Sequence, residues 1–241
     1  MGRMMRYGSR AKLGYLIPSV NLAAECQFPA MAPQGVSLHF TRLKLVNANP
    51  EELRRMADGL EPAVELLKDA GVTSITFHCT AVTTSAPGMD EKLIQRIQKA
   101  SGLPATATGR AIVTALNTLK AKKLVLITPY PKHVNDKEEA FLRANGFDVL
   151  ENWAEGINDG LAMFAADAQL WKRRALEHRR EDADAYFISC AQIRSPEIVE
   201  ELERELGRPV ITSNTAAFWH SLRLSGVEDR IQGFGRLLAQ H

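Results

Sequence analysis

The chain has 241 residues, of which 45% are hydrophobic and 24% are charged, so one large domain or two small ones with a sizeable core are expected and disorder is not. Thirty Lys and Arg against 28 Asp and Glu give a net charge of +2, which provides no electrostatic reason to expect a nucleic acid or a membrane surface as partner. No apolar run is long enough for a transmembrane helix, and the basic N-terminus lacks the apolar segment of a secretory signal. Three cysteines are too few for a disulfide framework, which favours free thiols and a cytoplasmic location.

Strand and helix patterns alternate through the first half of the chain. A helix is expected to open at Asn49-Pro50-Glu51-Glu52, where the Asn can cap and the Pro suits the first turn, and to end at Gly71. A second helix is expected between Asp90 and Gly102. Strands are predicted at residues 12–17, 36–45, 73–78 and 104–106.

The same alternation begins again after residue 120. Strands are predicted at residues 123–128, 147–150, 185–189 and 209–212, and helices at about 135–145, 158–179 and 196–207. Alternating strands and helices predict a parallel sheet with crossover helices. The continuous apolar runs are typical of strands that are covered on both faces.

Two pairs of segments recur at one offset. Residues 12–18 resemble residues 123–129, and residues 75–79 resemble residues 186–190, in both cases 111 positions later. We therefore predict an α/β fold of two pseudo-symmetric, open parallel-sheet (βα)4-like domains with the active site in the cleft between them. Residues 1–115 together with residues 216–241 are expected to form the N-terminal half, and residues 116–215 the C-terminal half.

Cys79 and Cys190 each follow the third predicted strand of their half. Ligands of open α/β sheets bind at the carboxyl ends of strands, so the two thiols are predicted to face one cleft from opposite walls. Opposed thiols, with an ordinary pKa of about 8.5, suit the movement of a proton between the two faces of a carbon atom. The alternative is that both are small buried hydrophobes. Cys26 has no repeat partner and is expected to be structural.

Several short motifs, in this order and spacing, resemble one family. The chain resembles the aspartate/glutamate racemase superfamily, and within it the branch of maleate cis-trans isomerases and arylmalonate decarboxylases. The motifs are Gly14-Tyr15-Leu16-Ile17-Pro18-Ser19-Val20-Asn21, Cys79-Thr80-Ala81, Thr128-Pro129-Tyr130, Gly156-Ile157-Asn158, Ser189-Cys190 and Ser213-Asn214-Thr215.

The resemblance implies cofactor-independent chemistry on a small carboxylate, in a homo-oligomer. Decarboxylases of the branch keep only the second cysteine, so Cys79 together with Cys190 favours a maleate isomerase-like or racemase reaction. Val20 and Ala81 depart from the family pattern and leave the substrate open. The alternatives are a decarboxylase of a substituted malonate, an amino-acid or hydantoin racemase, and a non-catalytic protein that binds small acids.

For a maleate-like substrate, Cys79 is expected to add to the double bond and Cys190 to handle the proton. Hydrogen-bond donors are needed where negative charge develops on the substrate carboxylate. The candidate substrate-binding residues are Ser19, Asn21, Thr80, Ala81, Tyr130, Asn158 and Ala191.

Several of these residues have a plainer alternative role. Asn21 and Asn158 can cap the helices that follow them, Tyr130 can cover a strand end, and Thr80 can satisfy local backbone groups. His78 precedes Cys79 on a strand and should face the other way, so it is not expected to be the base. No histidine pattern predicts a metal site, and no glycine-rich motif predicts nucleotide binding, so no cofactor is expected.

Overall fold

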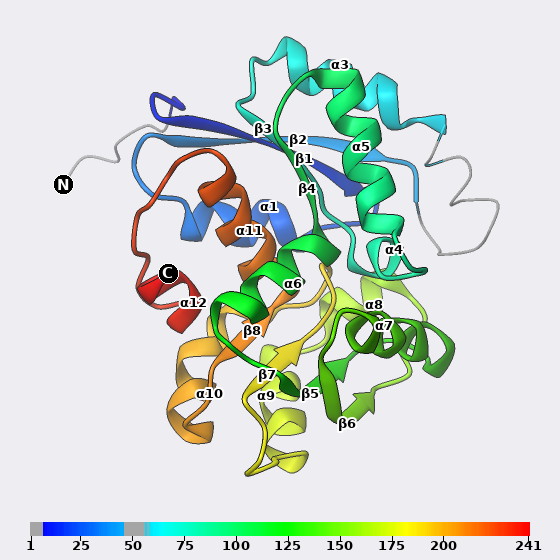
Figure 1. Ribbon diagram of the computed structural model, residues 1–241, viewed down its shortest axis with the longest axis vertical. Helices are drawn as coiled ribbons and strands as arrows, with labels where there is room; N and C mark the ends of the chain where they lie inside the picture. The colour runs from blue at the N-terminus through cyan, green and yellow to red at the C-terminus, as the bar shows by residue number, and fades with distance from the viewer. Residues whose placement is uncertain (1–6, 46–55, 57) are drawn as a thin grey trace.

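The computed structural model describes residues 7–45, 56 and 58–241, and within them it contains two four-stranded parallel sheets (Figure 1). The first sheet has the strand order β2-β1-β3-β4 and the second has the matching order β6-β5-β7-β8, which confirms the predicted pair of sheets. The strands are β1 (Ala11–Pro18), β2 (Val36–Leu43), β3 (Ser74–Phe77), β4 (Ala105–Ala107), β5 (Lys123–Thr128), β6 (Asp148–Ala154), β7 (Ala185–Ile188) and β8 (Val210–Thr212).

The pairing of the strands repeats as well as their order. Leu13 of β1 lies opposite Ser74 of β3, and Leu124 of β5 lies opposite Ala185 of β7. Each residue of the second pair stands 111 positions after its counterpart, which is the offset seen in the sequence. The repeat is therefore structural, and it places equivalent residues at the ends of equivalent strands.

Side chains from the two faces of each sheet enter different cores. Tyr15 of β1 and Leu126 of β5 belong to a central core shared by both halves, whereas Leu16 and Val125 belong to outer cores on the far side of each sheet. Successive side chains of a strand point to opposite faces, so a strand buried on both sides is apolar throughout.

Helices fill the central layer and cover the two outer faces (Figure 1). The central layer contains α1 (Ala23–Met31), α6 (Thr108–Thr118), α11 (Ser213–Leu224) and α12 (Arg236–Gln240), while α7 (Lys132–Ala144) flanks the second sheet. The outer helices are α3 (Leu60–Asp69) and α5 (Met89–Ser101) on the first sheet, and α9 (Ala168–Glu177) and α10 (Val199–Leu206) on the second. The division expected after residue 115 falls within α6, and α11 packs on α6 and also contacts the first sheet.

Two helix predictions need correction, and one lies outside the described residues. The single helix expected at 158–179 is wrong, because the chain is extended at Ala166 between α8 (Gly160–Ala165) and α9. The Asp167 side chain accepts a hydrogen bond from the Gln169 amide at 3.0 Å and starts the second helix, as a short acidic side chain at a cap commonly does. The helix expected at 196–207 begins as a 3-10 turn (Pro196–Ile198) before α10. The cap expected at Asn49-Pro50-Glu51-Glu52 lies outside the described residues.

A four-residue helix, α4 (Thr80–Thr83), follows β3 directly.

None of the described helices has the length and apolar character needed to cross a membrane.

Candidate active site

A cavity of about 330 Å³ lies where strands of both sheets end. Its walls come from the segments after β1, β2 and β3 of the first sheet and after β5, β6 and β7 of the second, as expected for a ligand site at the carboxyl ends of parallel strands. The lining residues are Pro18, Val20, Asn21, Leu45, Cys79, Thr80, Ala81, Tyr130, Pro131, His133, Val134, Asn158, Gly160, Met163, Cys190, Ala191 and Gln192.

Both cysteines and all but one of the candidate substrate-binding residues line this cavity. The exception is Ser19, whose hydroxyl is 3.3 Å from the Leu45 carbonyl oxygen and 3.2 Å from the Leu45 amide nitrogen. Ser19 therefore joins the chain after β2 to the chain after β1, beside the cavity and outside its lining.

Cys79 stands at the cap position of α4 in ordinary extended backbone, with φ −156° and ψ 109°. Its carbonyl accepts hydrogen bonds from the amide and the hydroxyl of Thr83, which fixes the turn from β3 into the helix. Burial raises the pKa of the Cys79 thiol to about 12; the Val82 amide opposes this shift, and negative charge on Cys190 adds to it.

Cys190 has a different backbone, since its φ of 106° lies in the left-handed region that residues other than glycine rarely adopt. The Gln192 amide donates to the Cys190 sulfur at 3.3 Å, and the Cys190 amide donates to the Ser213 hydroxyl at 3.0 Å. Burial raises the pKa of the Cys190 thiol to about 11, while the Tyr130 hydroxyl and the amides of Gln192 and Ile193 oppose the rise. Hydrogen-bond donors are therefore grouped around the Cys190 sulfur atom.

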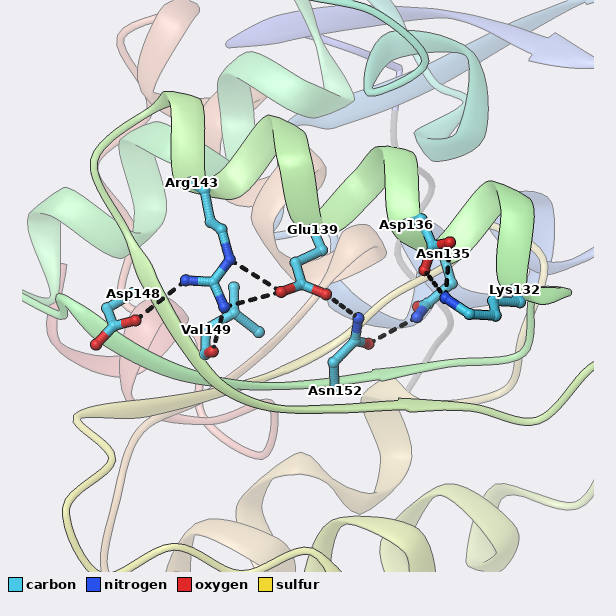
Figure 2. A network of polar contacts seen from close by, with 8 residues as sticks. All are labelled: Lys132, Asn135, Asp136, Glu139, Arg143, Asp148, Val149 and Asn152. Atoms are coloured by element: carbon cyan, nitrogen blue, oxygen red, sulfur yellow. Dashed lines mark hydrogen bonds and ion pairs between the residues drawn. The ribbon is translucent and has the colours of Figure 1, made fainter.

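A chain of hydrogen bonds along α7 fixes the segment that carries Tyr130. The Tyr130 amide donates to the Thr128 hydroxyl at 3.3 Å, and that hydroxyl donates to Asn135 at 2.8 Å. The Asn135 amide donates a hydrogen bond to Asn152, and the Asn152 amide donates to Glu139, which forms an ion pair with Arg143 (Figure 2). The tyrosine is buried, and its hydroxyl lowers the pKa of the nearby Cys190 thiol.

Two amide side chains join the halves beside the cavity. Asn21 donates to the Ala191 carbonyl at 2.8 Å and accepts from the Ala24 amide at 3.0 Å, so its expected capping role is present together with a place in the cavity wall. Gln192 donates to the carbonyl of Val20 at 2.7 Å and accepts from the Leu22 amide at 2.9 Å.

Gln192 was missed by the sequence reasoning, although the repeat carried a signal for it. It stands 111 positions after Ala81, as Ala191 does after Thr80. His133 and Met163, which also line the cavity, were missed because each lies on a helix whose orientation no motif indicated.

The Thr80 hydroxyl is buried and has no hydrogen-bond partner in the described part of the chain, which leaves it available to a ligand. Asn158 is exposed at the cavity rim. The alternative that Asn158 caps the next helix is wrong, because Asp159 does so by accepting from the Ala162 amide at 2.7 Å.

The remaining candidates lie away from the cavity. His78 is fully buried, 3.1 Å from the Thr108 hydroxyl and 3.0 Å from Asn214, and burial lowers its pKa to about 4. This agrees with the expectation that His78 faces away from the cleft. Cys26 is exposed on α1. Within the described ranges, no three His, Cys, Asp or Glu side chains are grouped as metal ligands.

Comparison with known proteins places this chain in a family. A family model described as arylmalonate decarboxylase matches residues 13–238. The maleate isomerase of Nocardia farcinica is 30% identical over 241 residues, which cover 95% of this chain and 96% of that protein. The arylmalonate decarboxylase of Bordetella bronchiseptica is 31% identical over 169 residues, 68% of each chain.

A solved structure of a cysteine-to-serine mutant of the Nocardia farcinica maleate cis-trans isomerase, with a covalently bound succinylcysteine intermediate, matches with a TM-score of 0.90 and 28% identity. The match covers 96% of this chain and 99% of that one. These relatives are isomerases and a decarboxylase, so the chain is an enzyme, with an isomerase as its main assignment. It belongs to the arylmalonate decarboxylase family, in the branch of the aspartate/glutamate racemase-like superfamily that also holds the maleate isomerases.

Proposed function

We propose that this chain is a maleate cis-trans isomerase that works with two cysteines and no cofactor. The observation that carries the proposal is that Cys79 and Cys190, from equivalent strand ends of the two halves, line one cavity. The maleate isomerase relatives support the substrate, and the succinylcysteine in the Nocardia farcinica structure supports covalent chemistry at a cysteine.

Neutral donors would hold the two carboxylates of maleate. Among the described lining residues none is a lysine or an arginine, so the available side-chain donors are amides, hydroxyls and the His133 imidazole. The Thr80 hydroxyl has no competing partner in the described part of the chain, and the Asn158 amide is exposed at the rim. A donor aimed at the carboxylate where charge develops is worth about 3 kcal/mol in the transition state.

The reaction needs one thiolate and one thiol. The Cys79 sulfur bonds to one alkene carbon, and the displaced electron pair moves onto the carboxylate beside the other carbon. Cys190 donates its proton to that second carbon, which leaves a single bond free to rotate. Cys190 then takes a proton back from the same carbon, the carbon–sulfur bond breaks, and fumarate leaves with both cysteines returned to their starting states.

The electrostatics of the cavity do not favour two thiolates at once, and the donors around Cys190 leave its pKa, about 11, below that of Cys79, about 12. Burial raises both pKa values, and charge on Cys190 further raises the pKa of Cys79. The pair therefore loses one proton before it loses two. After one proton has left, the other can stay on either sulfur. A group that favours the protonated form of Cys190 leaves Cys79 as the thiolate, and therefore as the nucleophile.

Conversion of maleate to fumarate, followed by proton NMR, tests the proposal. Maleate should give fumarate without carbon dioxide and without added metal or nucleotide. Release of carbon dioxide from a substituted malonate instead would indicate a decarboxylase. Racemisation of aspartate, glutamate or a hydantoin would indicate a racemase, and ligand binding without turnover would indicate a small-acid binding protein.

The cytoplasmic location, the homo-oligomer and the division of the chain at residues 115 and 215 stay predictions. So do the individual roles of the site residues.

A further inference from the structure

A buried carboxyl group is hydrogen-bonded to the residue before Cys190 and takes no part in the proposed reaction. Glu138 of α7 is fully buried, and its Oε1 accepts a hydrogen bond from the Ser189 hydroxyl at 2.6 Å. Ser189 directly precedes Cys190, whose backbone is held at a positive φ. The carboxyl is thus tied to the turn that presents the thiol.

The second oxygen of the same carboxyl, Oε2, is buried and has no hydrogen-bond partner in the described part of the chain. Within that part, no ion pair joins Glu138 to a basic side chain. A buried carboxylate without a cation is costly, so the group exchanges its proton near neutrality instead of staying ionised. Burial raises its pKa to about 7, and the Ser189 hydroxyl partly opposes the rise.

The titratable groups around Glu138 are those of the cavity. Negative charge on Glu138 raises the pKa of Cys190 at the end of β7 and that of Tyr130 after β5, and Tyr130 also interacts with Cys79. On α7 itself, Glu139 is turned toward Arg143 and Asn152, in the network of Figure 2. Glu138 is therefore the carboxyl on this helix that faces the thiols.

We propose that Glu138 is a positioning residue that favours the protonated form of Cys190, the acid of the proposed reaction, against the nearby donors that favour its thiolate. The proposal rests on the proposed function, which requires one thiol and one thiolate. The ionised carboxyl opposes a second negative charge on the nearby Cys190 but acts on Cys79 only from across the cavity. Its hydrogen bond to Ser189 at the same time holds the Cys190 turn.

Differential alkylation tests this without any substrate. Wild type and Glu138→Gln are treated with iodoacetamide between pH 6 and pH 9, and peptide mass spectrometry measures labelling of Cys190 and Cys79 relative to exposed Cys26. The substituted amide would still accept from Ser189 but carries no charge. We expect Cys190 labelling to rise about tenfold at the alkaline end, as one pKa unit implies, and to match wild type at pH 6, where the wild-type carboxyl is neutral.

Asp136→Asn is the matched control, because it removes one charge from α7 at an exposed position that pairs with Lys132, and it should leave Cys190 labelling unchanged. A ratio of Glu138→Gln to wild type that is constant across the pH range would overturn the proposal and indicate a purely structural role. If Glu138→Gln does not fold, Ser189→Ala serves instead. Loss of the hydroxyl donor should raise the pH at which Glu138 ionises and begins to suppress Cys190 labelling, and an unchanged profile would count against the proposal.

The pH dependence of turnover gives a second readout, which separates the proposed role of Glu138 from the proposed isomerase activity. If maleate is isomerised, the alkaline limb of the kcat profile should move to lower pH in Glu138→Gln, because Cys190 loses its proton earlier. An alkaline limb that does not move would contradict the role of Glu138 while leaving the isomerase intact. If maleate is not turned over at all, the labelling profile still decides whether Glu138 controls the thiol.

Discussion

The two cavity walls that carry Cys79 and Cys190 have the same strand topology, but the backbone and the hydrogen-bond donors around the two sulfur atoms differ. Both cysteines follow the third strand of a sheet, and β7 repeats β3 at an offset of 111 residues. Cys79 then enters the short helix α4 through ordinary backbone, whereas Cys190 turns at a φ of 106° and gathers donors from Tyr130 and Gln192.

The fold is therefore symmetric in the strands that build the cavity and asymmetric in the surroundings of the two sulfur atoms. A racemase that shuttles one proton between two thiols gains from equivalent surroundings for both. A nucleophile and an acid need different surroundings, because one must lose its proton while the other keeps it. The unequal walls therefore favour the isomerase over the racemase.

Removal of either thiol should have the largest effect. Cys190→Ala is expected to lower kcat for maleate by about 10²–10⁴-fold through loss of the acid, and Cys79→Ala by more through loss of the nucleophile. Steady-state kinetics on the purified variants checks this. Full activity of Cys79→Ala would move the assignment toward decarboxylase-like chemistry, for which one cysteine is enough.

Tyr130→Phe tests the difference between the surroundings of the two thiols, because it removes a donor from Cys190 but not from Cys79. The pKa of Cys190 should rise further, since the hydroxyl now opposes the effect of burial. We expect kcat to fall by about 10²-fold, because a Cys190 thiol with a higher pKa donates its proton to the substrate carbon less readily. Iodoacetamide labelling against pH measures the thiol, and unchanged Cys190 labelling would show that the hydroxyl does not act on the sulfur.

Thr80→Val and Ser19→Ala each delete one hydroxyl beside the cavity and should behave in opposite ways. Thr80→Val should lower turnover by about tenfold with little change in stability, because the buried hydroxyl has no partner to lose in the described part of the chain. Ser19→Ala should change turnover less than about threefold but lower the free energy of unfolding by about 1 kcal/mol, since its contacts with Leu45 are lost. Urea unfolding and kinetics on both variants give the comparison, and the reverse pattern would place Ser19 in the site.

The sheets and the cysteines were predictable because they depend on patterns that the chain carries locally. Apolar runs between helical segments indicated the strands, and the offset of 111 brought Cys79 and Cys190 to equivalent ends. Ser19 shows the limit of this reasoning. A motif gives the position of a residue near a strand end, whereas the direction of its side chain depends on the turn that follows.

Features that arise from tertiary packing escaped the sequence. The positive φ of Cys190 is imposed by its surroundings and has no signal in a Ser-Cys dipeptide. Glu138 lies in a charged stretch that is typical of a solvated helix face, and only the packing of α7 shows that this carboxyl is buried. Asp167 ended the expected long helix because capping competes with helix propagation, a balance that apolar spacing does not report.

Trapping the covalent intermediate tests the division of roles between the two walls most directly. Cys190→Ser protein is incubated with maleate, denatured, digested and analysed by mass spectrometry. We expect a succinyl adduct on the peptide that contains Cys79, and none on the peptide that contains Cys26 or on the peptide that contains residue 190. An adduct on Cys190 of the Cys79→Ser protein, with none on Cys79 in the reciprocal variant, would contradict it.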